Sequence, residues 1–211
     1  MILTGNYKNH KSNNIKAYSV SFNKEINDNF NGETFSLLVP SYKCDYLNKY
    51  DIKSVWNFIN CYYKNTLAKL DPEEVYNELN GSILLSEEES DEPSIRHIIS
   101  AWFEIFLGNT TMEVKTMNDN YVGIIDETEK RPIFIKEMLE EVIRKCTDMQ
   151  GFESIRALYL ANNAHLYRTI ADSCDDLLKQ QEYLNYYVKY LMSSQEEEEN
   201  YRKLVLGQKI D

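Results

Sequence analysis

The sequence predicts an α/β domain over residues 1–117, followed by an all-α domain over residues 118–211. In the first part, short apolar segments bounded by turn residues alternate with helical patterns, which is typical of a small sheet with flanking helices. In the second part, only helical spacing follows. Asn118, Asp119, Asn120 and the region of Gly123 favour a junction between the two parts.

Three segments in the first 40 residues predict strands. Residues 2–4 form a short apolar segment that Gly5 and Asn6 are expected to end. Residues 17–22 alternate with a period of two, and residues 35–39 form a third apolar run closed by Pro40.

Two helices are predicted next, each with a recognisable start. Asp51 is a good N-cap residue before an amphipathic pattern. One buried face is expected for its apolar positions: Ile52, Val55, Trp56, Ile59, Tyr63, Leu67 and Leu70. Asp71 and Pro72 begin the second helix as cap and first turn, Glu74 occupies the capping-box position, and Gly81 ends it.

The segment from Ser82 to Gly108 is the most informative part of the chain. Residues 82–85 predict a buried strand, and an acidic loop runs from Ser86 to Glu92. Ser90 or Asp91 is expected to cap the next helix, which ends at Gly108. The core stripe of that helix is expected to be Ile95, Ile98, Ile99, Trp102 and Phe106. With a further strand at residues 112–117, the alternation is Rossmann-like. Ligands of such sheets bind where a strand's carboxyl end meets a helix N-terminus.

Three helices are predicted in the second part. Pro132 opens the first, and the third starts near Asp175 and extends toward the acidic run Glu196–Glu199, which is expected to be a solvated helix face. The inward residues are expected to be Ile135, Met138, Leu139, Val142 and Cys146, then Phe152, Ile155, Leu158, Tyr159, Leu166 and Ile170, then Leu177, Leu184, Val188 and Leu191.

Composition excludes several classes of protein. With 7 Gly and 4 Pro, the chain is neither fibrous nor disordered. No apolar run approaches the roughly 20 residues of a membrane helix, and no apolar signal segment is present, so a cytoplasmic protein with no membrane partner is expected. Cys44, Cys61, Cys146 and Cys174 contain no C-x-x-C pair and are expected to be reduced. The three histidines are far apart, so no metal site and no cofactor are predicted.

The net charge of −11 is spread along the chain, because residues 1–117 carry 11 Lys and Arg against 16 Asp and Glu, and residues 118–211 carry 12 against 18. Such a surface repels phosphate backbones and disfavours direct nucleic-acid binding. It suits a basic protein partner, including one that normally holds nucleic acid; the alternative is that acidity only maintains solubility. Heavy use of Asn, Lys, Tyr and Ile indicates an AT-rich genome, such as that of a low-GC bacterium or its phage.

Several segments of residues 1–117 match one known family in order. Residues 2–5 and 17–21 match its first two strands, and Val39-Pro40-Ser41-Tyr42 matches its A-P-S-Y/W motif. Residues 67–79, LAKLDPEEVYNEL, match L-x-x-L-D-P-E-E-V-x-E-L, and residues 84–104 align with its signature segment. This part resembles the domain of unknown function 488 family, which comprises small bacterial and phage α/β proteins.

The departures from that family concern its reactive groups. Ser86 and Ser94 stand where the family has two cysteines, Ile95 where it has a histidine, and Phe22 where an arginine often follows the second strand. The resemblance therefore implies lost thiol or metal chemistry, because a serine hydroxyl needs an activating base to act as a nucleophile. The retained signature residues are Glu88, Arg96, His97 and Trp102.

The small-ligand hypothesis centres on Arg96, which would hold a phosphate or carboxylate near a helix N-terminus. The candidate ligand-binding residues are Thr4, Asn6, Ser41, Tyr42, Ser86, Glu88, Ser94, Arg96 and His97. Alternatively, Arg96 pairs with Asp91 or Glu92. A Ser94–His97 hydrolase is disfavoured because no G-x-S-x-G elbow exists, and the acidic loop lacks the ligand register of a Ca²⁺ or Mg²⁺ site. No catalytic residue is predicted.

The partner-binding hypothesis concerns the last helix. Its candidate residues are Tyr183, Tyr186, Tyr187, Tyr190, Glu196, Glu197, Glu198 and Glu199. Tyrosine is enriched at protein interfaces, although ordinary packing between helices is the alternative.

Three functions follow from these hypotheses. The leading one is a non-enzymatic acidic binding protein on a degenerated α/β domain, one concrete form being a phage-encoded inhibitor of a host nucleic-acid-handling or defence protein. The rival is an enzyme or a nucleotide or small-anion binder that uses the crevice around Arg96 and His97. In the third, the α/β part is a scaffold and the C-terminal helices form an oligomer.

Overall fold

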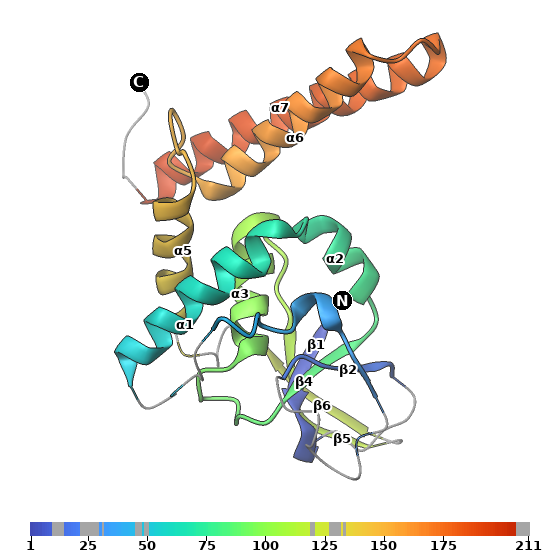
Figure 1. Ribbon diagram of the computed structural model, residues 1–211. Helices are drawn as coiled ribbons and strands as arrows, with labels where there is room; N and C mark the ends of the chain where they lie inside the picture. Colours follow the sequence, from blue (N-terminus) through green and yellow to red (C-terminus); the bar gives the residue numbers. More distant parts are fainter. Residues whose placement is uncertain are drawn as a thin grey trace. The chain divides into compact units, whose positions relative to one another are not determined.

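The fold class predicted from the sequence is confirmed: an α/β fold is followed by an all-α region (Figure 1). The computed structural model describes residues 1–9, 15–21, 30, 32–44, 48, 51–118, 121–126, 132 and 134–205, and residues 115–126 by their backbone alone. The chain divides into two compact units, Met1–Cys146 and Thr147–Asp211. The division therefore follows a helix that the sequence analysis assigned to the second part, and does not fall at residue 117.

The first unit contains a mixed sheet with the strand order β3-β2-β4-β1-β5-β6. Five strands are parallel to one another: β1 (Leu3–Asn6), β2 (Ala17–Ser19), β3 (Glu33–Thr34), β4 (Ile83–Ser86) and β5 (Met112–Asn118). Strand β6 (Tyr121–Asp126) pairs antiparallel with β5. The expectation that only helices follow residue 117 was wrong, since β6 adds an edge strand.

The register of the sheet separates an apolar face from a polar one. Leu3 pairs with Ile83, which also pairs with Ala17, so these residues share one face. They form a core cluster with Tyr7, Leu85 and Val114. Thr4 pairs with both Leu84 and Glu113 on the opposite face. Because side chains alternate along a strand, Asn6 and Ser86 lie on that face as well.

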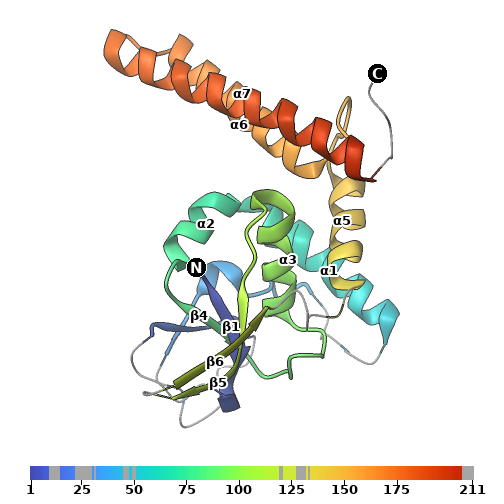
Figure 2. The same ribbon diagram turned by 180° about the vertical axis from the view of Figure 1, so that it is seen from behind.

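In the described part of the first unit, the α-helices are α1 (Ile52–Asn65), α2 (Pro72–Leu79), α3 (Ile95–Leu107) and α5 (Phe134–Cys146). Helix α3 lies beside β1 and β4, and it also packs against α2 and α5 (Figures 1 and 2). The predicted caps Asp51 and Asp71 are confirmed, because their carboxylates accept hydrogen bonds from the Lys53 and Glu73 backbone N–H groups at 3.1 and 2.8 Å.

Helix α3 begins later than predicted. Its N-cap is Ser94, whose hydroxyl accepts a hydrogen bond from the His97 N–H at 3.3 Å, and not Ser90 or Asp91. Ser94 has the extended backbone that an N-cap requires, and Pro93 precedes it. The predicted end is confirmed, since Gly108 adopts a left-handed conformation with φ of 68°. The predicted core stripe is buried, apart from Phe106, which is half-buried.

Other local predictions were wrong for identifiable reasons. The run at residues 35–39 contains a 3-10 helix, η2 (Ser36–Leu38), in place of a strand; the buried Tyr62 hydroxyl donates to the Leu38 carbonyl at 2.6 Å. Gly5 and Asn6 continue β1 and do not end it. Ile52 is 57% exposed, because the first residue of α1 lies outside its buried face. Phe22 lies outside the described residues.

The second unit contains helices α6 (Ile155–Asp172) and α7 (Leu177–Val205), which run side by side as a hairpin (Figure 1). Ser154 caps α6 by accepting from the Ala157 N–H at 3.2 Å. Several predicted inward residues are exposed: Leu166, Ile170, Leu177 and Val188. Within the described residues, no helix combines the length and the apolar character that crossing a bilayer requires.

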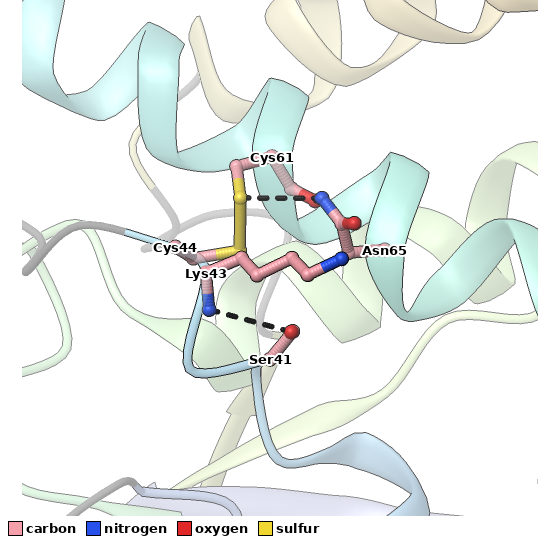
Figure 3. Close-up of a disulfide and its surroundings, with 5 residues drawn as sticks. All are labelled: Ser41, Lys43, Cys44, Cys61 and Asn65. Carbon is pink, nitrogen blue, oxygen red and sulfur yellow. Dashed lines mark hydrogen bonds between the residues drawn. A yellow bond between two sulfur atoms is a disulfide. The ribbon is translucent and has the colours of Figure 1, made fainter.

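Two cysteines are joined in a disulfide, contrary to the expectation that all four are reduced. Cys44, in the loop after η2, is bonded to Cys61 in α1, with their Cα atoms 5.5 Å apart (Figure 3). Asn65, one turn along α1, donates to the Cys61 carbonyl at 2.9 Å. Cys146 is exposed, and its predicted inward orientation was therefore wrong. The disulfide attaches the loop to the helix that packs on α5.

Reducing this disulfide is expected to lower the free energy of unfolding by about 3 kcal/mol, the loop-entropy value for cysteines separated by 17 residues. Urea unfolding with and without a thiol reductant measures the difference. The double variant Cys44→Ser/Cys61→Ser should reproduce the reduced state. The control variant Cys146→Ser/Cys174→Ser should keep the full response to reductant. Identical unfolding midpoints for reduced and oxidised protein would show that the bond adds no stability.

Candidate functional site

The guanidinium of Arg96 is fully buried and is held by protein acceptors on all sides. Its Nη2 donates to Glu113 Oε1 at 3.0 Å, and Nε donates to Glu113 Oε2 at 3.4 Å. Its Nη1 donates to the Ser86 hydroxyl at 2.5 Å, and Nη2 also donates to the Glu89 carbonyl at 3.1 Å. Glu88 adds a second carboxylate 3.8 Å from Nη1.

Glu113 provides the principal counter-charge, and the sequence analysis did not single it out. It lies in β5 beside β1, and the Thr4 hydroxyl donates to its Oε2 at 2.6 Å. The two-pronged contact with Arg96 is the geometry in which a guanidinium binds a carboxylate most strongly. The sequence does contain a signal, because a carboxylate between Met112 and Val114 in an apolar strand needs a buried partner.

Asn6 and His97 hold the same loop that Arg96 contacts. Asn6 Nδ2 donates to the carbonyls of Glu87 and Glu88 at 2.6 and 3.0 Å. His97 Nδ1 lies 2.9 Å from the Glu92 carbonyl. Because a carbonyl can only accept, Nδ1 carries the proton in this hydrogen bond. Three buried side chains, Asn6, Arg96 and His97, therefore fix the backbone of the acidic loop.

The acidic loop, residues 86–92, presents carboxylates to solvent on the outside of this network. Glu87, Glu89 and Asp91 are exposed, whereas Glu88 is half-buried beside Arg96. Glu89 forms an exposed ion pair with Lys8 at 3.1 Å. The Glu89 N–H donates to the Glu92 carboxylate at 3.1 Å, which closes the loop on itself. Polar groups thus shape the loop from inside, while Glu87, Glu89 and Asp91 face water.

A second buried polar pair lies at the carboxyl ends of β1 and β2. The Tyr7 hydroxyl and the Ser19 hydroxyl are 2.6 Å apart, and neither residue was predicted to belong to the site. Burial raises the pKa of the Tyr7 phenol, so it stays neutral and hydrogen-bonded.

The structure brings together six of the nine predicted ligand residues: Thr4, Asn6, Ser86, Glu88, Arg96 and His97. Ser94 is adjacent but acts as the helix cap. Within the described residues, no hydrogen bond joins Ser41 or Tyr42 to Arg96: Ser41 accepts from the Lys43 N–H, and Tyr42 is 89% exposed. The predicted alternative was that Arg96 pairs with Asp91 or Glu92. The ion pairs of Arg96 are instead with Glu113 and Glu88.

This arrangement favours a structural role for Arg96 over the binding of a small ligand. An incoming phosphate or carboxylate would compete with Glu113 and Glu88 for a guanidinium whose donors already have acceptors. Across the part of the chain that the structure describes, no three His, Cys, Asp or Glu side chains gather as a metal ion would require.

The predicted partner-binding tyrosines of α7 pack largely on α6. Tyr167 of α6 stacks on Tyr183, Tyr186 and Tyr190, with ring centroids 6.4, 5.1 and 5.4 Å apart. The guanidinium of Arg168 lies 5.8 Å from the ring centre of Tyr187. This geometry corresponds to the alternative of packing between helices, although Tyr186 remains partly exposed.

The acidic run Glu196–Glu199 also makes contacts within the hairpin. Glu198 accepts hydrogen bonds from the Glu153 and Ser154 N–H groups at 2.9 and 3.0 Å, at the N-terminus of α6. Glu197 pairs with Arg156 of α6 at 3.4 Å, and Glu199 pairs with Lys203. At the other end of the hairpin, Gln180 Nε2 donates to the Ala171 carbonyl at 3.1 Å. The acidic run is therefore not only a solvated helix face, because Glu197 and Glu198 also contact residues at the start of α6.

No family model, curated protein or solved structure matches the chain. The resemblance of residues 1–117 to the domain of unknown function 488 family stays a prediction.

Breaking the Arg96–Glu113 pair from one side is expected to cost about 3–5 kcal/mol of stability, because it leaves a buried charge uncompensated. Glu113→Leu and Arg96→Met should each show this loss in urea unfolding. The double variant should lose clearly less than the sum of the two, with a coupling of about 2 kcal/mol or more. The exposed pair Glu141–Lys145 is the control and should show at most about 1 kcal/mol. Additive losses at Arg96 and Glu113 would mean that the two charges do not stabilise each other.

Proposed function

We propose that the protein is a non-catalytic binding protein whose acidic loop docks on a basic protein partner. The observation that carries this proposal is that the polar side chains of the crevice are used to hold the loop. Asn6, Arg96 and His97 contact its backbone carbonyls, and Glu87, Glu89 and Asp91 are left exposed.

Two physical arguments support a basic partner. A loop that is ordered before binding loses less conformational entropy on association than a flexible one. The net charge of −11 also attracts a cationic surface over a distance and raises the rate of encounter. A protein that normally holds nucleic acid has such a surface, so an inhibitor of a host nucleic-acid-handling or defence protein, encoded by a phage, is the concrete form of the proposal.

Descent from the domain of unknown function 488 family would agree with a loss of thiol reactivity. If residues 1–117 descend from the domain of unknown function 488 family, Ser86 and Ser94 replace two cysteines. In this chain Ser86 accepts from Arg96, and Ser94 caps α3. Both hydroxyls thus have structural uses in place of the reactivity that a thiol would supply.

The rival function, an enzyme or a nucleotide or small-anion binder at Arg96 and His97, has less support because Glu113 and Glu88 already neutralise the guanidinium. The predicted cytoplasmic location stays a prediction; the Cys44–Cys61 bond is of a kind that is rare in a reducing cytosol.

The loop variant Glu87→Gln/Glu89→Gln/Asp91→Asn is expected to bind the partner about tenfold more weakly. Three exposed ion pairs at about 0.5 kcal/mol each amount to roughly one decade in affinity. The partner is first captured from the native host with wild-type protein, then purified for titration calorimetry at low and high salt.

The control variant Glu78→Gln/Glu137→Gln/Glu141→Gln removes the same charge from exposed positions elsewhere on the first unit and should bind as wild type does. Equal weakening by both variants would mean that net charge alone drives binding and that the loop is not the docking element. Thermal stabilisation of the wild-type protein by inorganic phosphate or a nucleotide, lost in the Arg96→Met variant, would instead favour the rival function.

A further inference from the structure

The six residues 39–44, which we call the tethered segment, are anchored to α1 at both ends. Directly before the segment, the carbonyl of the buried Leu38 accepts a hydrogen bond from the Tyr62 hydroxyl at 2.6 Å. At its other end, the disulfide joins Cys44 to Cys61, the residue that precedes Tyr62 on α1. Two adjacent positions of one helix therefore hold the segment.

The hydrogen bonds of the tethered segment are local. The Lys43 N–H donates to the Ser41 hydroxyl at 3.4 Å, and the Cys44 N–H donates to the Ser41 carbonyl at 2.9 Å (Figure 3). Among the residues that the structure describes, none of the hydrogen bonds of this segment reaches a strand or an α-helix. Its attachment to α1 therefore depends on the disulfide, together with the packing of the buried Pro40.

The two bonded cysteines differ in exposure. Cys44 is 7% exposed, whereas Cys61 is half-buried. Access decides which sulfur of a disulfide an incoming thiolate attacks, so Cys61 is the sulfur attacked and Cys44 the leaving group. Asn65 Nδ2 donates to the Cys61 sulfur at 3.4 Å, and this contact also suits a thiolate at that position.

We propose that the Cys44–Cys61 disulfide is a redox switch, which a dithiol reductant opens to release the tethered segment from α1. First, a thiolate of the reductant attacks the Cys61 sulfur, the S–S bond breaks, and Cys44 leaves as a thiolate. The second thiolate of the reductant then displaces Cys61 and closes a disulfide within the reductant. Two electrons pass from the reductant to the protein, and the two protons that the reductant loses are taken up by Cys44 and Cys61. The oxidised form of such a dithiol closes the switch by the reverse steps.

Opening the switch changes a part of the chain that the sequence analysis had singled out. Ser41 and Tyr42 were predicted to bind a ligand, but the structure places them within the tethered segment. A segment with few contacts to the core opens at a low free energy once its covalent link is removed. The Leu38 carbonyl keeps its hydrogen bond to α1, so the release stays local. The switch is independent of the role proposed for the acidic loop.

Cleavage by trypsin after Lys43 reports on the release, because a protease cuts only chain that has opened, and Lys43 is exposed next to Cys44. The full chain is digested in its oxidised form and after reduction with dithiothreitol and desalting without air. Mass spectrometry of the quenched, reduced and alkylated samples measures cleavage after Lys43 and after Lys64 of α1. The ratio of the two rates should rise more than about tenfold on reduction, since global unfolding would expose both sites alike.

Two variants separate this disulfide from the other cysteines. Cys44→Ser/Cys61→Ser should show the high ratio without any reductant, and Cys146→Ser/Cys174→Ser should respond to reduction as wild type does. Oxidising the reduced wild-type protein again should restore the low ratio. A ratio that reduction leaves unchanged would overturn the switch, because the bond would then act only on the stability of the whole unit.

The attacked sulfur is identified by brief exposure of the oxidised protein to reduced glutathione, followed by an acid quench and peptide mass spectrometry. The mixed disulfide should form on Cys61, the more exposed of the two cysteines. A mixed disulfide on Cys44 would overturn the proposed order of the two steps.

Discussion

The first unit depends on neutralising one buried positive charge. Arg96 has no exposed surface, and the desolvation of a guanidinium is so unfavourable that its environment must supply compensation. That environment is assembled from three separate segments: residues 86–89, which run from the end of β4 into the acidic loop, Glu113 in β5, and Thr4 in β1, which orients Glu113. Because those segments meet only in the folded chain, the charge network requires the strand order that the sheet adopts.

The parts of this structure that local sequence could predict are those set by neighbouring residues. The caps at Asp51 and Asp71, the left-handed Gly108 and the buried stripe of α3 all depend on interactions within one or two turns of helix. The Arg96–Glu113 and Cys44–Cys61 contacts could not be predicted in this way, because the partners come from different elements. In α7, Leu177 and Val188 were expected to face inward but are exposed, and the packing on α6 includes tyrosines that stack on Tyr167.

Residues that suggest chemistry in a sequence can serve structure when seen in three dimensions. Ser94 and His97 have the spacing of a nucleophile and its base, but the Ser94 hydroxyl accepts from the His97 backbone and the imidazole contacts the Glu92 carbonyl. Likewise, Glu198 resembled part of a surface binding run, but it accepts hydrogen bonds from the Glu153 and Ser154 N–H groups directly before α6. In both places the identity of the hydrogen-bond partner, and not the residue type, distinguishes the two roles.

The polar contacts at the two ends of the hairpin determine its mechanical character. Glu198 binds the beginning of α6, and Gln180 binds near its end, so a slip of α7 by one turn, about 5.4 Å, would break both contacts together. These two contacts therefore hold α6 and α7 in one register. Over the 18 residues of α6 this gives a helical hairpin about 27 Å long whose two helices keep one register.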